Sequence, residues 1–343
     1  MDRIALVGAG SLGTILGAYI SKHRQIDLVD VNSEHVDTLN ENGARVVGTL
    51  EMTVPVRAVT PKELEGYYDL VLLLVKQLYT DEALDQLEPH LKEDSIICTL
   101  QNGYPELHLI ARYGVDRVMG CSVGWGATWL GPGVSELTSN PDHMSFQLGR
   151  IDGKITENLK DVESLLALMC PVFITNNLPG VRWAKLLTNA TFSGLSAALG
   201  CTFGDILDDP VTSEYAQYLI NEIIGVATAS GVEELPTDGV DLGKYLRFST
   251  EEKRQEVAVM VDTLWTPHRL LRASMLQDLE KGRRCEIDEI NGIVSSEGKR
   301  VGRKTPFCDR VIEIVKNIEA GRSTYSMENL PLLEEVLKAE RLS

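Results

Sequence analysis

Residues 3–23 read RIALVGAGSLGTILGAYISKH, and this stretch decides the fold of the first half of the chain. The run 3–7 is short, apolar and partly β-branched, which is typical of a buried parallel strand. Three glycines follow in the pattern G-x-G-x-x-G, and an apolar-faced segment then continues as a helix. A glycine fingerprint placed between a strand and a helix predicts a Rossmann-type dinucleotide-binding domain.

Each position of the fingerprint has its own physical role. Gly8 permits the tight turn, Gly10 lets the backbone approach a pyrophosphate, and Gly13 allows the helix to pack closely on the strand. Ser11 and Leu12 open the helix, whose positive dipole end then faces the phosphates. A glycine-rich turn without a ligand is the alternative interpretation, and the flanking strand and helix favour the cofactor site.

The second predicted strand, IDLVD at 26–30, ends at Asp30. An acidic residue about 20 positions past the glycines can accept hydrogen bonds from the adenosine ribose hydroxyls. The next residues, VNSEH, contain no Arg or Lys to pair with a 2'-phosphate. The sequence therefore predicts NAD(H) as the preferred cofactor and leaves NADP(H) open. The alternative role for Asp30 is that of a loop cap.

Two further buried strands, within 69–76 and 94–103, run into polar residues. Ligands in open parallel sheets bind just beyond the carboxyl ends of the strands. Lys76 and Asn102 are therefore expected where a nicotinamide and a substrate would lie. The alternative, to which we give equal weight, is that each is an ordinary loop residue exposed to solvent.

The remaining patterns divide the chain near residue 178. Segments broken by Gly and Pro at 120–139 look like hairpins that close a sheet, and a helix near 158–169 and a strand at 172–177 complete the first half. Beyond Pro179 the patterns are almost all helical. The candidate helices run 181–199, 213–230, 250–271, 286–302 and 309–320. We expect a dinucleotide-binding domain at 1–178 and a helical substrate or dimerisation domain at 179–343.

The helix that opens the second half carries a polar line. Lys185, Asn189 and Ser193 recur every fourth residue in an otherwise apolar segment, and such residues share one face of a helix. A lysine that extends from a buried helix to solvent is the alternative explanation. Further on, Ser274 and Glu286 lie at the starts of two segments, and a glutamate at a helix start usually complements the helix dipole.

Composition limits the classes of function. The formal net charge of -17 repels nucleic acid and anionic membranes, and no apolar run reaches the ~20 residues that a membrane span needs. The start of the chain does not resemble a signal peptide. The six cysteines are scattered and the six histidines have no ligand spacing, which predicts reduced thiols in the cytoplasm and no metal site.

In order and spacing, the motifs of this chain resemble those of the ketopantoate reductase family, the 2-dehydropantoate 2-reductases. The matching stretches are GAGSLG at 8–13, VK at 75–76, LQNG at 100–103, WAKLLTN at 183–189 and SMLQD…GRRCEIDEING at 274–292. The resemblance implies a Rossmann domain joined to an all-helical domain, with the active site in the cleft between them. It also implies a small anionic 2-keto acid as substrate, and a homodimer by analogy alone.

The resemblance implies roles for individual residues. Lys185 would be the general acid that protonates the carbonyl oxygen of the substrate, and Glu286 would hold Lys185 or a substrate hydroxyl beside the cofactor. Asn189 and Ser274 match substrate-binding positions, as does Asn102, which together with Lys76 would also lie beside the nicotinamide.

The chain departs from the family pattern at three positions that are expected to be polar. Ser193 stands in place of an asparagine, while Phe203 and Leu271 cannot make an amide's hydrogen bonds. These changes predict a less polar pocket, although Ser193 keeps a hydroxyl for the substrate. The expected reaction is reduction of 2-dehydropantoate to (R)-pantoate. The alternatives are an NAD-dependent D-2-hydroxy-acid dehydrogenase for branched or aromatic acids, and a dinucleotide sensor without turnover.

Overall fold

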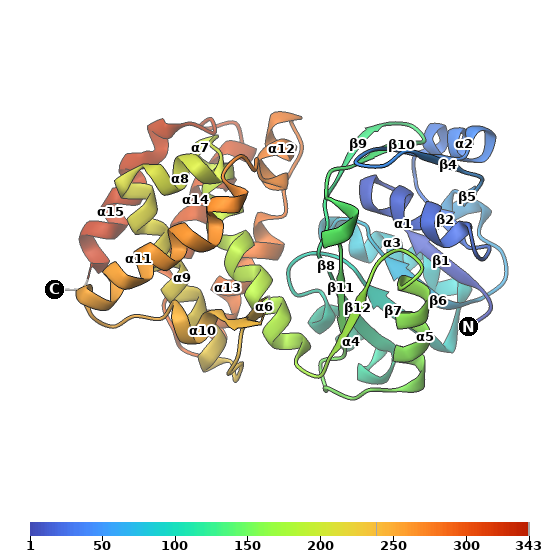
Figure 1. Ribbon diagram of the computed structural model, residues 1–343, viewed down its shortest axis with the longest axis horizontal. Helices are drawn as coiled ribbons and strands as arrows, with labels where there is room; N and C mark the ends of the chain where they lie inside the picture. Colours follow the sequence, from blue (N-terminus) through green and yellow to red (C-terminus); the bar gives the residue numbers. More distant parts are fainter. Residues whose placement is uncertain (238, 342–343) are drawn as a thin grey trace. The chain divides into compact units, whose positions relative to one another are not determined.

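A computed structural model describes residues 1–237 and 239–341 of the chain. The chain forms two compact units, one of residues 1–178 and one that begins at Pro179. The first unit is built on sheets and the second on helices (Figure 1). The predicted α/β class, with a Rossmann-type first part and a helical second part, is confirmed.

An eight-stranded sheet forms the centre of the first unit, in the order β12-β11-β8-β7-β6-β1-β2-β5. Its strands are β1 (Ile4–Val7), β2 (Asp27–Val29), β5 (Arg57–Val59), β6 (Tyr68–Leu73), β7 (Leu91–Thr99), β8 (Val118–Val123), β11 (Phe146–Gly149) and β12 (Val172–Thr175). All neighbours pair in parallel except β8 and β11. The strand order reverses at β1, so the crevice beyond its carboxyl end is the expected ligand site of such a sheet.

Alternate residues of β1 enter two separate cores. Ile4 and Leu6 pack with apolar side chains of α1 and α5, whereas Ala5 and Val7 pack with those of α3 and α4. The helices of this unit are α1 (Ser11–Ser21), α2 (Ser33–Asn42), α3 (Thr80–Leu87), α4 (Glu106–Tyr113) and α5 (Glu157–Leu166). Burial on both faces explains why β1 is a continuous apolar run.

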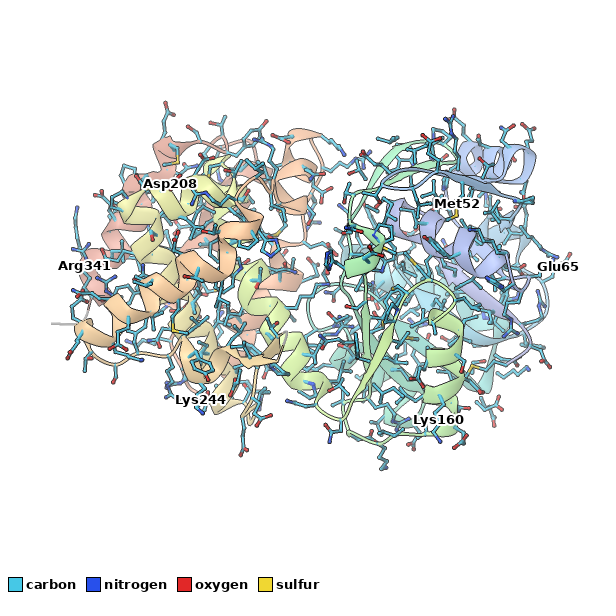
Figure 2. All side chains as sticks on the ribbon, in the orientation of Figure 1. Met52, Glu65, Lys160, Asp208, Lys244 and Arg341 are labelled. Atoms are coloured by element: carbon cyan, nitrogen blue, oxygen red, sulfur yellow. The ribbon has the colours of Figure 1, made fainter. Side chains whose placement is uncertain are left out.

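A second sheet covers α1 on the side away from the main sheet. It has the order β4-β3-β10-β9, with β3 (Ala44–Gly48), β4 (Met52–Val54), β9 (Ala127–Gly131) and β10 (Val134–Leu137). Helix α1 contacts all four strands, and Figure 2 shows Met52 on β4. The prediction of hairpins at 120–139 is correct for β9 and β10, which pair antiparallel with each other, while β8 belongs to the main sheet. The hairpin joins the second sheet because β10 pairs with β3, and together these strands cover the apolar outer side of α1.

The second unit packs around α9 (Pro210–Ala229), which contacts helices before and after it in the chain and buries residues on all sides. The helical run that opens the unit comprises α6 (Leu178–Thr188), a π-helix (Asn189–Ser193) and α7 (Gly194–Leu199). The other helices are α8 (Phe203–Asp208), α10 (Leu242–Tyr245), α11 (Glu251–Trp265), α12 (Ser274–Glu280), α13 (Ile287–Arg300), α14 (Pro306–Glu319) and α15 (Leu330–Glu340). The sequence did not predict α8, α10, α12 or α15, and it also missed a short strand pair, Pro236–Thr237 with Val240–Asp241.

The carboxyl group of Glu222 ties two helices of this unit together. Glu222 of α9 accepts hydrogen bonds from the backbone N–H groups of Phe307 (3.1 Å) and Cys308 (2.8 Å), in the first turn of α14. These bonds satisfy donors that have no partner within their own helix. Burial raises the pKa of Glu222 to about 8, while the two N–H groups oppose that shift.

None of the helices that the structure describes is both long and apolar enough to cross a membrane.

Candidate functional site

The three glycines of the fingerprint are required for different reasons. Gly8 has a φ of +96°, and a Cβ there would lie 2.6 Å from the backbone nitrogen of Val75. A Cβ on Gly13 would lie 2.0 Å from the carbonyl oxygen of Gly8, because α1 passes close to the turn. A Cβ on Gly10 would meet no atom within 4 Å. Of the three glycines, Gly10 is therefore the one at which a side chain would not clash with the protein itself.

The start of α1 can receive an anion. Gly10 is its N-cap residue and makes no side-chain capping bond, and the first turn holds no acidic residue. Ser11 and Leu12 are half-buried and Gly10 is exposed. Backbone N–H groups at an uncapped helix N-terminus, together with the helix dipole, favour a pyrophosphate at this position.

Asp30 follows β2 directly and is half-buried. Its Oδ1 accepts a hydrogen bond from the N–H of Asn32 at 3.0 Å, so the loop-capping role is real. A carboxylate offers about four acceptor sites, and this bond uses one of them. Asp30 can therefore cap its loop and still accept hydrogen bonds from ribose hydroxyls.

The loops that follow β6 and β7 are held together by two glutamines. The side chain of Gln77 donates to the carbonyl of Asn102 (2.6 Å), and that of Gln101 donates to the carbonyl of Val75 (2.8 Å). Val75 in turn lies against Gly8, so the glycine turn and both loops gather at one edge of the sheet. The structure thus brings the Lys76 and Asn102 loops together, as the sequence predicted.

Gln101 itself was not predicted as part of the site. It is 5% exposed, and its side-chain nitrogen also donates to the Thr80 hydroxyl at 2.8 Å. The signal was present in the sequence as a polar residue between a buried strand and the asparagine of LQNG. A buried amide between two loops needs partners on both, and this need fixes their spacing.

In the helical unit, the line of Lys185, Asn189 and Ser193 spans two types of helix. Lys185 is half-buried on α6, and Asn189–Ser193 is a π-helix, whose bonds join residue i to residue i+5. Such a helix has about four residues per turn, so residues four apart still lie on nearly the same side, and Ser193 is 7% exposed. The polar line is therefore compatible with both helix types, and its role in a substrate site stays a prediction.

Asn291 holds α13 against this π-helix. Its side-chain amide donates to the carbonyl of Ala190 at 2.9 Å, and its own backbone carbonyl accepts from the Cys308 thiol at 3.2 Å. Asn291 is fully buried. This residue was not among the predicted site residues, although an asparagine four positions after Ile287, within an apolar helix face, is a recognisable exception to the pattern.

Glu286 is the N-cap residue of α13 and is 7% exposed. It lies five residues before Asn291, so the bond to Ala190 also sets where Glu286 stands relative to the helical run that carries Lys185. Ser274 is the first residue of α12 and is exposed. A glutamate that only interacts with the helix dipole usually lies on the surface. The burial of Glu286 therefore indicates a role beyond that interaction.

Two departures from the family pattern lie in different surroundings. The ring of Phe203 is 3% exposed and packs on Phe192, which also stacks on Trp265 with centroids 4.8 Å apart. Phe203 therefore belongs to the aromatic core of the unit, and its effect on the polarity of the pocket stays a prediction. Leu271 is 44% exposed and its neighbour Leu270 is 94% exposed.

The fold and the open start of α1 place the chain among the dinucleotide-binding oxidoreductases. Two family models cover most of its length: "Ketopantoate reductase PanE/ApbA" matches residues 4–152, and "Ketopantoate reductase PanE/ApbA C terminal" matches residues 177–319. The chain therefore belongs to the ketopantoate reductase family, as its motifs predicted.

Relatives and solved structures resemble the chain over nearly its whole length. The 2-dehydropantoate 2-reductase of Streptococcus pyogenes serotype M3 is 29% identical over 92% of this chain and 98% of its own, and that of Mesorhizobium japonicum is 27% identical over 94% and 100%. The 2-dehydropantoate 2-reductase structure from Geobacter metallireducens has a TM-score of 0.77 at 25% identity, covering 92% and 99%. A ternary structure of D-mandelate dehydrogenase with NADH and anilino(oxo)acetate has a TM-score of 0.79 at 24% identity, covering 93% and 99%, and it supports the fold.

Proposed function

We propose that this protein reduces a 2-keto acid with a nicotinamide dinucleotide, and that its substrate is 2-dehydropantoate, which becomes (R)-pantoate. The observation that carries the proposal is the match of both family models, in order, to a chain whose glycine turn is open at Gly10. The names of the curated relatives support the choice of acid. All six cysteines are buried free thiols, which suits the reducing cytoplasm, where we place the reaction.

The residues of the first unit suit a dinucleotide. Gly8, Gly10 and Gly13 with the N–H groups of Ser11 and Leu12 hold the pyrophosphate. Asp30 accepts from the ribose hydroxyls and repels a 2'-phosphate, which favours NAD(H) over NADP(H). The bound cofactor supplies hydride to the keto carbon.

The loops beyond β6 and β7 contribute the other end of the cofactor site. Lys76 and Asn102 lie beside the nicotinamide, and Gln101 keeps the two loops at a constant distance.

The helical unit supplies the proton and the substrate contacts. Negative charge develops on the carbonyl oxygen during reduction, and the ammonium of Lys185 stabilises it and then donates a proton to it. Glu286 orients Lys185 or a substrate hydroxyl. Asn189, Ser193 and Ser274 hydrogen-bond the acid.

A second candidate within the same chemistry is an NAD-dependent dehydrogenase for 2-hydroxy acids with branched or aromatic side chains. The exposed pair Leu270 and Leu271, four and three residues before Ser274, favours it because apolar walls select alkyl or aryl groups. A sensor without turnover is the third candidate, and the half-buried Lys185 and buried Glu286 count against it because a sensor needs no proton donor.

The deciding experiment follows nicotinamide absorbance after addition of 2-dehydropantoate, 2-ketoisovalerate or phenylglyoxylate, each with NADH and with NADPH. Fastest turnover of 2-dehydropantoate supports the first candidate, and preference for the two unhydroxylated acids supports the second. Turnover of none of them, with NADH still bound, supports the sensor. Lys185→Ala is the control: it must lose turnover and keep cofactor binding if the chemistry is as proposed.

A further inference from the structure

One carbonyl of the glycine turn is held from two sides inside the protein. The carbonyl oxygen of Ala9 accepts a hydrogen bond from the Thr14 hydroxyl at 2.6 Å and lies 2.7 Å from Nε2 of His35. Ala9 and Thr14 are fully buried and His35 is 2% exposed. Both lone pairs of this oxygen are therefore used, and water does not compete for them.

The partners of His35 determine which ring nitrogen carries the proton. A carbonyl oxygen can only accept, so Nε2 donates to Ala9. The other nitrogen, Nδ1, accepts from the backbone N–H of Gly133 at 2.9 Å, in the turn between β9 and β10. The neutral ring with its proton on Nε2 satisfies both bonds, and Trp129 of β9 packs its edge against the ring at a centroid distance of 6.3 Å. His35 thus joins the glycine turn to the β9–β10 hairpin.

The direction of the Ala9 carbonyl determines the direction of the next N–H group. A trans peptide is planar, so the C=O of Ala9 and the N–H of Gly10 point in opposite directions. With the carbonyl held toward the interior, the N–H of Gly10 points to the open side, where a Cβ on Gly10 meets nothing within 4 Å. Since glycine rotates more freely than any other residue, this peptide would reorient easily without the two bonds.

We propose that His35 and Thr14 are positioning residues that pre-orient the Gly10 N–H toward the pyrophosphate of the dinucleotide. The inference rests on the proposed function and extends it, because it makes the β9–β10 hairpin part of the cofactor site. Neither residue touches the ligand. Both act by removing the cost of orienting the peptide when the ligand binds.

The test measures the dissociation constants of NADH and of ADP-ribose, which carries the pyrophosphate without the nicotinamide. His35→Phe keeps an aromatic ring and loses both hydrogen bonds, and Thr14→Val removes the hydroxyl at nearly constant shape. Each is expected to raise both dissociation constants about five- to tenfold, the effect of one lost hydrogen bond, with kcat unchanged. His35→Gln keeps an amide donor and acceptor and is expected to recover part of the affinity.

Ser95→Ala is the matched control. The Ser95 hydroxyl is also fully buried and also makes two bonds, to the Tyr68 carbonyl (2.6 Å) and from the Lys92 N–H (2.7 Å), but at the opposite end of the sheet. It must lose stability and keep wild-type affinity. If Thr14→Val, His35→Gln and His35→Phe all fold and all bind both ligands with wild-type affinity, the inference is overturned. The proposed function is unaffected by that result. A wild type that binds neither NADH nor ADP-ribose overturns the proposed function as well.

Discussion

Replacing Gly10 with alanine separates the stability of the fold from its capacity to bind a dinucleotide. The new methyl group meets no atom of the protein within 4 Å, and Gly10 has a φ of -61°. The folded state therefore tolerates alanine, and the loss of unfolded-state entropy stabilises the protein by about 0.4–1 kcal/mol. The melting temperature should stay the same or rise.

The same methyl group lies where a pyrophosphate would approach the backbone. Loss of one hydrogen bond to a charged group weakens binding by about 1.5–3 kcal/mol, which is roughly a 10- to 150-fold rise in the dissociation constant of NADH. Differential scanning fluorimetry measures the first effect and isothermal titration calorimetry the second.

Gly13→Ala is the contrasting variant. Its Cβ would lie 2.0 Å from the Gly8 carbonyl oxygen, so α1 must move away from the turn, at a cost of about 1–3 kcal/mol or more. It should lower the melting temperature, whereas Gly10→Ala should not. A stable Gly10→Ala protein that binds NADH as tightly as wild type would show that the pyrophosphate does not lie at this turn, and the reasoning would be refuted.

Three further variants test the site and the stability of the helical unit. Asp30→Ala should weaken NADH binding about tenfold and reduce discrimination against NADPH, as measured by the ratio of the two KM values, because the carboxylate that accepts from the ribose is lost. Asn291→Leu leaves the Ala190 carbonyl without its donor and should cost about 1–3 kcal/mol in urea unfolding and lower kcat. Asn329→Leu removes the bonds to the Ala198 and Thr324 carbonyls and should cost at least as much while leaving kcat unchanged. For Glu222, the pKa of about 8 in the folded state lies above its unfolded value, so its contribution to stability is complete below about pH 4.5 and is lost as pH rises through 8. Unfolding free energy should therefore fall between about pH 4.5 and pH 8 in wild type and change less in Glu222→Gln. Equal slopes in the two proteins would contradict a raised pKa.

Features encoded within short stretches were predictable. The strand–glycine–helix pattern at 3–23 indicated a dinucleotide-binding unit, and the run 181–199 appeared as a helix because its apolar residues recur with helical period. The ordered motifs from GAGSLG to EIDEING identified the family, and each consists of neighbouring residues. Such signals survive without tertiary context because local backbone geometry produces them.

Features that join distant segments were not predictable. The strands β9 and β10 have the composition of a hairpin, but the pairing of β10 with β3 joins residues that are 89 positions apart, such as Val134 and Arg45. Only the need to cover α1 decides this pairing. The π-helix is invisible to a period-based reading because its sequence also suits an α-helix. Its stability depends on Asn291, which is 101 residues away from the carbonyl that it satisfies.

By itself, the sequence determined the class of fold and the family, because these depend on local patterns and on motif order. Only the tertiary structure decided that Phe203 belongs to the core, that Gln101 bridges two loops, and that His35 contacts the Ala9 carbonyl of the glycine turn. Each of these depends on which residue a single polar or aromatic side chain contacts. The contacted residue lies on another element of the fold, and a buried polar group must find a hydrogen-bond partner there.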